Sequence, residues 1–60
     1  MINEDIRTRV FFSGLKYRDI ARAMGCRHEY LSRIMRKPLN DRNRKKIFDA
    51  IQAVEEQREA

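Results

Sequence analysis

The chain has 60 residues, of which 14 are Lys or Arg and 9 are Asp or Glu, so its formal net charge is +5 at pH 7. A domain of this size buries only about 60% of the surface that its unfolded chain exposes, which excludes a multi-domain enzyme with a deep catalytic cavity. With 42% apolar residues, two Gly and one Pro, the composition favours a single all-α domain over residues 1–60.

The single cysteine, Cys26, has no partner for an internal disulfide, and together with His28 it is too sparse to form a metal site. The acidic start of the chain and the lack of a segment of about 18 apolar residues indicate neither export nor membrane insertion. We therefore expect a cytoplasmic protein with no membrane association, no cofactor, no metal and no small-molecule ligand.

Positive charge is concentrated in the middle of the chain. Residues 15–46 hold eleven Lys and Arg against three Asp and Glu, for +8, whereas residues 1–14 are neutral and residues 47–60 carry −3. Clustered cations of this kind are typical of proteins that bind a polyanion. The alternative is that these cations only make the outer faces of the helices soluble.

The first predicted helix covers about residues 3–13. Asn3 is a suitable N-cap, the two acidic residues after it suit a first turn, and Gly14 supplies the end. Ile2, Ile6 and Val10 follow a four-residue spacing and form one apolar stripe, which Phe11 and Phe12 widen beyond what a single contact needs.

The second predicted helix runs from Lys16 or Tyr17 to Met24. Its apolar residues fall at offsets of three and four, which is typical of an amphipathic helix: Tyr17, Ile20, Ala21 and Met24. The small Ala21 permits another helix to approach closely, and Gly25 can adopt the left-handed conformation of a sharp turn.

The third predicted helix follows this turn. At 100° per residue, Leu31 and Ile34 point the same way, with Met35 at the edge of that face. Polar residues cluster on the opposite side: Glu29, Ser32, Arg33 and Arg36. Pro38 disfavours helical geometry at Lys37, so the helix must end there.

The last predicted helix covers residues 41–57. Asn40 is a good N-cap for it, and its inner stripe has the helical spacing: Ile47, Ala50, Ile51 and Val54. Four predicted helices thus account for most of the chain.

Residues 17–36, YRDIARAMGCRHEYLSRIMR, resemble the helix-turn-helix motif of the lambda-repressor and Cro family of phage and bacterial DNA-binding proteins. The small residue of the motif is Ala21 and its turn glycine is Gly25; its apolar positions are Ile20, Met24, Cys26, Leu31 and Ile34. With the supporting helices, the resemblance extends from Ile6 to Val54. It implies a small bundle of four helices that contains a lambda-repressor-like DNA-binding motif.

The chain departs from the family pattern at the helix starts and at the C-terminus. Lys16, Tyr17 and Arg27 stand where the family usually has capping Ser or Thr and a Gln, and the short fifth helix of many members is absent or merged. These departures weaken the expected caps and leave the dimer contacts of the family without direct counterparts.

The resemblance implies that the second helix of the motif lies in the major groove of DNA, with its N-terminal residues against base edges. The chemistry of its side chains suits that role, because Arg pairs with guanine and Glu accepts from cytosine. The predicted base contacts are Arg27, His28, Glu29 and Arg33. The alternatives are a surface ion pair between Arg33 and Glu29, and a His28 that is only solvated.

Contacts to the DNA backbone are expected from residues that flank these positions, including the free amides at the start of the last helix. They are Lys16, Tyr17, Tyr30, Ser32, Arg36, Lys37, Asn40 and Asn43. The rings of Tyr17 and Tyr30 also have a packing role, in which only the hydroxyl reaches the surface.

One recognition helix contacts few base pairs, so we expect a homodimer, formed in solution or only on DNA, on half-sites about 34 Å apart. Phe12 and Phe48 are the predicted interface because they lie off the main apolar stripes. The alternative is that both rings belong to a broad core.

The predicted function is sequence-specific binding of double-stranded DNA by a small transcriptional repressor or Cro-like regulator that occupies an operator. An enzyme is not expected, because the chain has one His, no clustered carboxylates and no glycine-rich phosphate loop. The alternative is a helix-turn-helix module that binds protein, such as an antirepressor or an inhibitor of a nucleic-acid enzyme.

Overall fold

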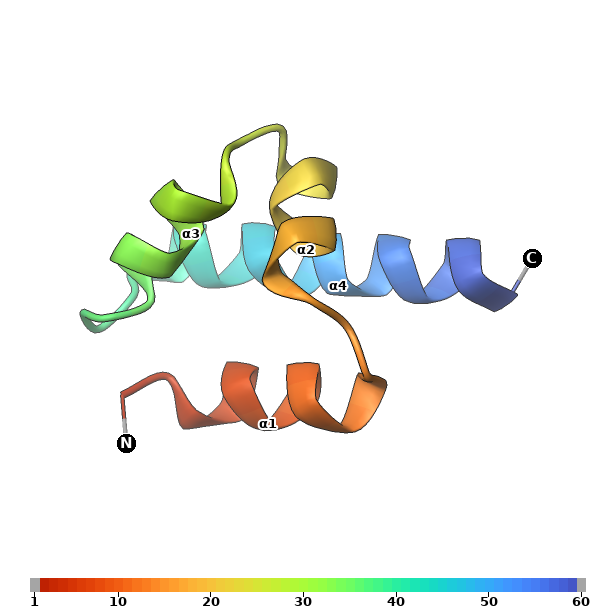
Figure 1. The fold of residues 1–60 in the computed structure, drawn as a ribbon. Coiled ribbons are helices and arrows are strands. Elements are labelled where there is room, and N and C mark those ends of the chain that lie inside the picture. Colours follow the sequence, from red (N-terminus) through yellow and green to blue (C-terminus); the bar gives the residue numbers. More distant parts are fainter. Residues whose placement is uncertain (1, 60) are drawn as a thin grey trace.

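The computed structural model describes residues 2–59 and consists of four helices in this range. They are α1 (Glu4–Ser13), α2 (Tyr17–Met24), α3 (His28–Ile34) and α4 (Asp41–Glu59) (Figure 1). The predicted all-α bundle of four helices is confirmed. The last helix continues two residues beyond the predicted end, and none of the described helices is both long and apolar enough to cross a membrane.

The long α4 packs against α1 and α2, and α2 packs against α3. α1 lies below α2 and α3 in Figure 1, with its N-terminal end near the end of α3. Three residues, 25–27, join α2 to α3, as in a helix-turn-helix. In this arrangement α3 is held by its inner side only.

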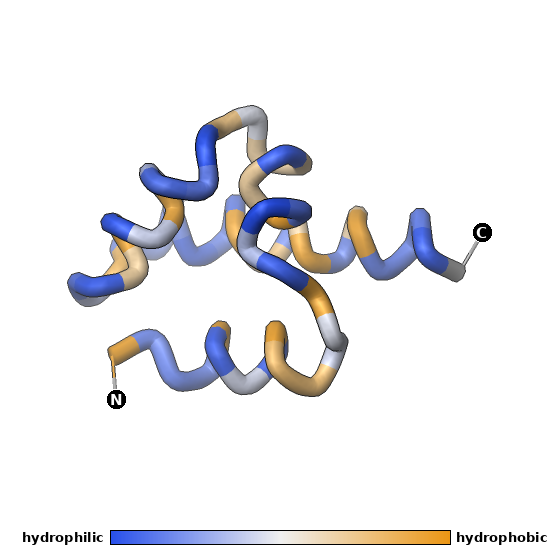
Figure 2. The backbone as a smooth tube through the Cα atoms, in the orientation of Figure 1, coloured by the Kyte–Doolittle hydropathy of each residue, from blue (hydrophilic) through white to orange (hydrophobic). Residues whose placement is uncertain are grey.

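All four helices contribute to a single apolar core. Its buried residues are Ile6, Val10, Leu15, Ile20, Ala21, Leu31, Met35, Ile47, Ala50, Ile51 and Val54. The predicted inner stripes of α2 and α4 account for most of them, and Figure 2 shows the outer turns of α3 as largely hydrophilic. The side of α3 that faces away from this core is therefore available for a partner.

Both predicted glycine turns are confirmed. Gly14 and Gly25 have φ of 68° and 77°, in the left-handed region where residues with a Cβ are strained. After α2, the amide of Gly25 donates to Arg22 O at 3.1 Å and the amide of Cys26 donates to Ala21 O at 2.9 Å. These bonds close the end of α2 and direct the chain into α3.

Asn3 stands at the N-cap position of α1, as predicted, with φ of 58°, but its side chain makes no cap hydrogen bond. Instead, Nδ2 donates to Met35 O at 3.1 Å and to Lys37 O at 2.9 Å. Carbonyls at the end of a helix lack partners within the helix, and here those that follow α3 recruit the amide.

The predicted stripe on α1 is confirmed at Ile6 and Val10, which are buried, but not at Ile2, which is 45% exposed. Phe11 and Phe12, which widen the stripe beyond what a single contact needs, are 78% and 80% exposed. Phe11 and Phe12 follow Val10 by 100° and 200° around the helix, which turns both rings away from α4. Leu15, which follows the Gly14 turn, is buried in the core at the end of α1.

The third helix ends earlier than predicted, at Ile34, and its packed face is shifted. Met35, expected at the edge of that face, is 1% exposed, whereas Ile34 is only half-buried. Met35 follows Leu31 by four residues, so it continues the same face, and its amide donates to Leu31 O at 3.0 Å.

Candidate nucleic-acid interface

The outer side of α3 carries the residues that the sequence selects as base contacts. Leu31 is 1% exposed and anchors the helix to the core, whereas Glu29 and Arg33 on the other side are exposed. Ser32 lies between the two sides and is half-buried. The predicted division of α3 into a packed face and a free face is confirmed.

An open hollow of about 380 Å³ lies on this free face. It is lined by His28, Glu29, Ser32, Arg33 and Arg36. The structure thus brings together three of the four predicted base contacts and two of the predicted backbone contacts. The hollow offers both hydrogen-bond donors and acceptors in a water-accessible position, which suits the edges of bases or phosphate oxygens.

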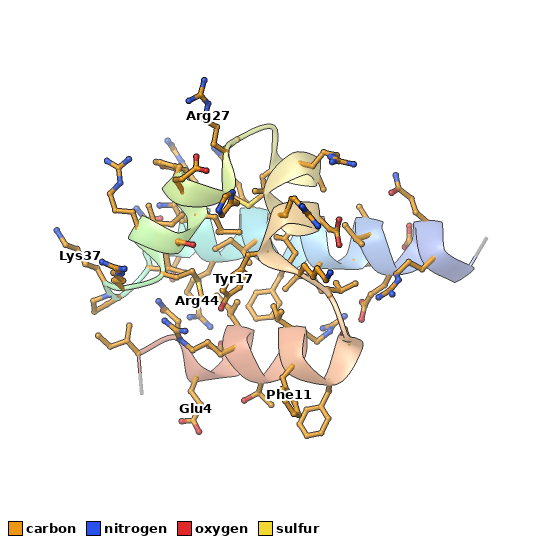
Figure 3. The ribbon with its side chains drawn as sticks, in the orientation of Figure 1. Glu4, Phe11, Tyr17, Arg27, Lys37 and Arg44 are labelled. Carbon is orange, nitrogen blue, oxygen red and sulfur yellow. The ribbon has the colours of Figure 1, made fainter. Side chains whose placement is uncertain are left out.

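Arg27, the fourth predicted base contact, lies outside the hollow. It is the residue before α3, its backbone is extended, and its side chain makes no cap hydrogen bond. The guanidinium projects from the turn between α2 and α3, away from the body of the protein (Figure 3). Arg27 therefore extends the cationic surface beyond the N-terminal end of α3.

Glu29 is paired with His28 and not with Arg33. The distance between His28 Nδ1 and Glu29 Oε1 is 3.1 Å, and both side chains are more than half exposed. Within residues 2–58, no ion pair joins Arg33 to Glu29, so the alternative in which they form a surface pair is not observed. The Arg33 guanidinium is left to solvent or to a ligand.

Residues 35–37, which follow α3, have exposed side chains at residues 36 and 37 and backbone carbonyls that accept hydrogen bonds from the start of the chain. Arg36 and Lys37 are exposed, and Lys37 projects outward at the end of the molecule (Figure 3). Arg7 Nη2 donates to Met35 O at 3.1 Å, beside the Asn3 contacts to the same segment. Neither contact is visible in the sequence, because no local pattern indicates that a side chain near the start of α1 will reach a carbonyl more than 25 positions away.

The start of α4 differs from the prediction in one respect. Asn40 caps the helix, as predicted, because its Oδ1 accepts a hydrogen bond from the amide of Asn43 at 2.8 Å. That amide is consequently not free for a phosphate. Asn40 remains exposed and Asn43 is half-buried, so the side chain of Asn43 alone would have to make the predicted contact.

The remaining predicted backbone contacts have different exposures. Lys16 is exposed where α2 begins, and Tyr30 is 44% exposed. Tyr17 is half-buried and packs against the core, which confirms the packing role considered for its ring. Lys16 and Tyr30 are thus the more accessible of the three.

Acidic groups near the seam between α1 and α4 are paired with arginines. Arg9 Nη2 lies 2.6 Å from Glu55 Oε1, and Ser13 Oγ donates to the other carboxylate oxygen at 2.7 Å; both contacts lower the pKa of Glu55. The hydrogen bond from Arg44 likewise lowers the pKa of Asp5. These carboxylates are neutralised locally and do not offset the cations of α3.

The two predicted dimer residues lie in different environments. Phe12 is 80% exposed on α1, which excludes the alternative that it joins the core. Phe48 is half-buried against the core, and the Arg44 guanidinium lies 5.8 Å from the centre of its ring. The structure therefore does not bring Phe12 and Phe48 into one exposed patch.

Residues 2–58 contain no group of three or more His, Cys, Asp or Glu that could hold a metal ion. Comparison of the chain with models of protein families, with curated proteins and with solved structures found no match.

Proposed function

We propose that the protein binds double-stranded DNA sequence-specifically through the outer side of α3 and acts as a small cytoplasmic repressor or Cro-like regulator that occupies an operator. The observation that carries this proposal is the hollow on α3, in which His28, Glu29 and Arg33 meet while Leu31 holds the helix from behind. Resemblance of residues 17–36 to the lambda-repressor and Cro motif supports the same reading.

The dimensions of α3 suit a major groove. A helix of seven residues is about 10 Å long, and the major groove of B-DNA is about 12 Å wide and admits one helix. In this position Arg33 or Arg27 would donate two hydrogen bonds to guanine O6 and N7, and Glu29 would accept from the amino group of cytosine. The Glu29 carboxylate lies 3.1 Å from His28 Nδ1, so two polar groups stand side by side at the start of α3.

Phosphates would be held by exposed polar groups on either side of α3. Tyr30 lies within α3, and Arg36 and Lys37 follow it. Lys16 precedes α2, and Asn40 precedes α4. Contacts of this kind fix the orientation of the protein on the duplex without selecting a sequence.

A salt series tests DNA binding as such. With about six phosphate contacts, the affinity for a generic duplex should fall by roughly a thousandfold between 50 and 200 mM salt, because counterions are released on binding. Fluorescence anisotropy of a labelled duplex measures this slope. A duplex that never saturates at 50 mM salt would contradict the proposal.

Sequence selectivity needs a separate experiment. Selection of bound duplexes from a random pool should yield a preferred site of a few base pairs per protomer, because one recognition helix contacts no more than that. If the pool remains random after repeated rounds while binding is salt-dependent, the protein binds DNA without sequence selectivity, which would contradict this part of the proposal.

The second candidate function is a module that binds protein, and the exposed pair Phe11 and Phe12 favours it. The two candidates differ in the salt series. A chain that ignores duplex DNA but captures a protein through the exposed rings of Phe11 and Phe12 would match the second candidate.

A further inference from the structure

Two side chains at the start of the chain hold the backbone of the segment that follows α3. Asn3 Nδ2 donates to Met35 O at 3.1 Å and to Lys37 O at 2.9 Å. Arg7 Nη2 donates to Met35 O at 3.1 Å. These bonds join residues that lie 28 to 34 positions apart in the sequence. The side chains of Asn3 and Arg7 are together called the exit clamp below.

The conformation and the chemistry of Asn3 both suit this contact. Its φ of 58° is the only positive φ at a residue other than glycine within residues 2–59. Asparagine enters this left-handed region at a lower cost than most residues with a side chain, and such a conformation persists where surrounding contacts hold it. Its carboxamide nitrogen has two N–H donors, which match the two carbonyls.

The segment held by the clamp carries two exposed cations, Arg36 and Lys37, that are proposed to contact phosphates. Its own hydrogen bonds are single-turn bonds, from the amide of Arg36 to Arg33 O at 3.2 Å and from the amide of Lys37 to Ile34 O at 3.3 Å. Bonds of this kind have poorer geometry than those of an α-helix. The bond from Asn3 to Lys37 O is therefore the contact that ties the far end of this segment to another part of the fold.

The clamp leaves the two cationic side chains free. Its bonds go to backbone carbonyls, and Figure 3 shows Lys37 projecting outward from this end of the molecule. A segment whose backbone becomes ordered only on binding loses conformational freedom at that moment, which lowers the affinity. A backbone that is already held avoids this loss, so the clamp bears on DNA binding although it touches no DNA.

We propose that Asn3, supported by Arg7, is a positioning residue for DNA: it fixes the backbone of residues 35–37 and thereby places Arg36 and Lys37 for contact with phosphates. Its effect on DNA rests on the proposed function, whereas its hold on the segment exists without DNA. Because phosphates are the same in every sequence, the effect extends to the selected site and to random duplex alike.

Asn3→Gly is the variant that isolates the side chain of Asn3. Glycine adopts positive φ without strain, so the backbone conformation is retained while both donors are lost. Arg7→Met is less suitable here, because the loss of its charge by itself weakens binding to DNA. Circular dichroism and urea unfolding establish that each variant is folded under the conditions of the binding experiments.

Ser13→Ala is the matched control. It removes an uncharged donor at the other end of α1, where Ser13 Oγ donates to Glu55 Oε2 at 2.7 Å. This bond fastens α1 to α4 and not to the segment after α3. The control variant should therefore resemble the parent protein in both experiments below.

Backbone amide relaxation measured by NMR without DNA tests the hold on the segment. The amides of Arg36 and Lys37 should have order parameters of about 0.85 in the parent protein, as in rigid backbone, and below about 0.6 in Asn3→Gly. Unchanged order parameters in Asn3→Gly, or an equal fall in Ser13→Ala, would overturn the proposal.

A double-mutant cycle on DNA affinity tests whether Asn3 acts through the two cations. Arg36→Ala together with Lys37→Ala keeps the backbone carbonyls, so Asn3 can still bond to them. In the parent background, Asn3→Gly should weaken binding to the selected and random duplexes by roughly five- to tenfold. In the background that lacks both cations, the same change should weaken binding by less than about twofold, because no phosphate contact then depends on the clamp.

Three outcomes of the cycle would overturn the proposal. An equal loss in both backgrounds would show that Asn3 acts only through the general stability of the fold. A loss confined to the selected site would assign its effect to base contacts, and an equal loss for Ser13→Ala would show that any weakening of α1 has this effect. If the parent protein binds no duplex, the proposed function fails, while the relaxation measurement still decides whether the clamp holds the segment.

Discussion

Arg33 and Lys37 are both exposed cations near α3, yet their positions imply different roles. Arg33 lines the hollow on the free face of α3, whereas Lys37 follows the helix and projects outward from the end of the molecule. A side chain over the base edges contributes selectivity, and one beside the phosphates contributes affinity for any sequence.

Substitution of each cation by alanine should separate these roles. Arg33→Ala should lose about 1–3 kcal/mol of binding free energy on the selected site and little on random duplex. Lys37→Ala should weaken binding to both duplexes alike and reduce the slope of affinity against salt concentration by about one. Anisotropy titrations on the two duplexes measure both effects. Equal losses on both duplexes for Arg33→Ala would remove it from the base contacts.

Arg7 links α1 to the end of α3 through contacts that the sequence does not reveal. Its Nη2 donates to Met35 O at 3.1 Å and its Nε donates to Ile2 O at 3.0 Å. Arg7→Met keeps an apolar stem but removes both bonds, so we expect the free energy of unfolding to fall by about 1 kcal/mol. Urea denaturation measures this change.

The matched control for Arg7 is another arginine on the surface. Arg18 on α2 is exposed, so Arg18→Met should change stability by less than about 0.5 kcal/mol. Equal stability of the Arg7 and Arg18 variants would mean that the link between α1 and the end of α3 contributes nothing measurable.

At the scale of the elements, α2 and α4 follow from their own sequences. Their apolar residues recur at helical spacing, and Gly25 and Asn40 mark a helix end and a helix start that the structure contains. Local patterns succeed here because the groups that stabilise these ends belong to the same few residues.

The errors arise where distant parts of the chain compete for the same residue. Asn3 suits a cap locally, but the carbonyls that follow α3 take its side chain. Ile2 continues the four-residue spacing of Ile6 and Val10, but it precedes the first residue of α1 and is 45% exposed. In the candidate site, residue types and spacing identify the face of α3, whereas the pairing of Glu29 with His28 depends on side-chain orientation that spacing does not define.

The turn between α2 and α3 can be tested with a pair of glycines. Gly14 and Gly25 both have positive φ, with no atom within 4 Å of an added Cβ, so alanine at either position is strained by its backbone alone. Each variant should lose about 1 kcal/mol of stability. Only Gly25→Ala should also weaken DNA binding, because Gly25 sets the angle between α2 and α3. An equal effect of both variants on binding would contradict a special role for this turn.

The contact between α1 and α4 should make the protein sensitive to acid. The pKa values of Glu55 and Asp5 are lowered in the folded state by Arg9 and Arg44, so their ionised forms stabilise the fold above the ordinary carboxyl pKa. This stabilisation should be lost as pH falls from about 4.5, the unperturbed value for Glu. Thermal unfolding of the parent and of Glu55→Gln between pH 3 and 7 checks it; a parent whose curve parallels that of the variant would contradict it.

At the scale of the whole molecule, the main feature is that charged and apolar surfaces lie on opposite sides. Cations gather at α3 and its exit, the apolar pair Phe11 and Phe12 lies on the opposite side, and one core of eleven buried residues separates them. A molecule of 33 × 22 × 18 Å thus presents two different surfaces. DNA must use one of these surfaces and leave the other unchanged.

Amide chemical-shift mapping with a short duplex tests this requirement most directly. Labelled protein titrated at low salt should show its largest shifts at residues 27–37 and around Asn40, with Phe11 and Phe12 unaffected when the duplex is saturated by one protomer. Shifts concentrated on α1, or no shifts at any residue, would contradict DNA binding through α3.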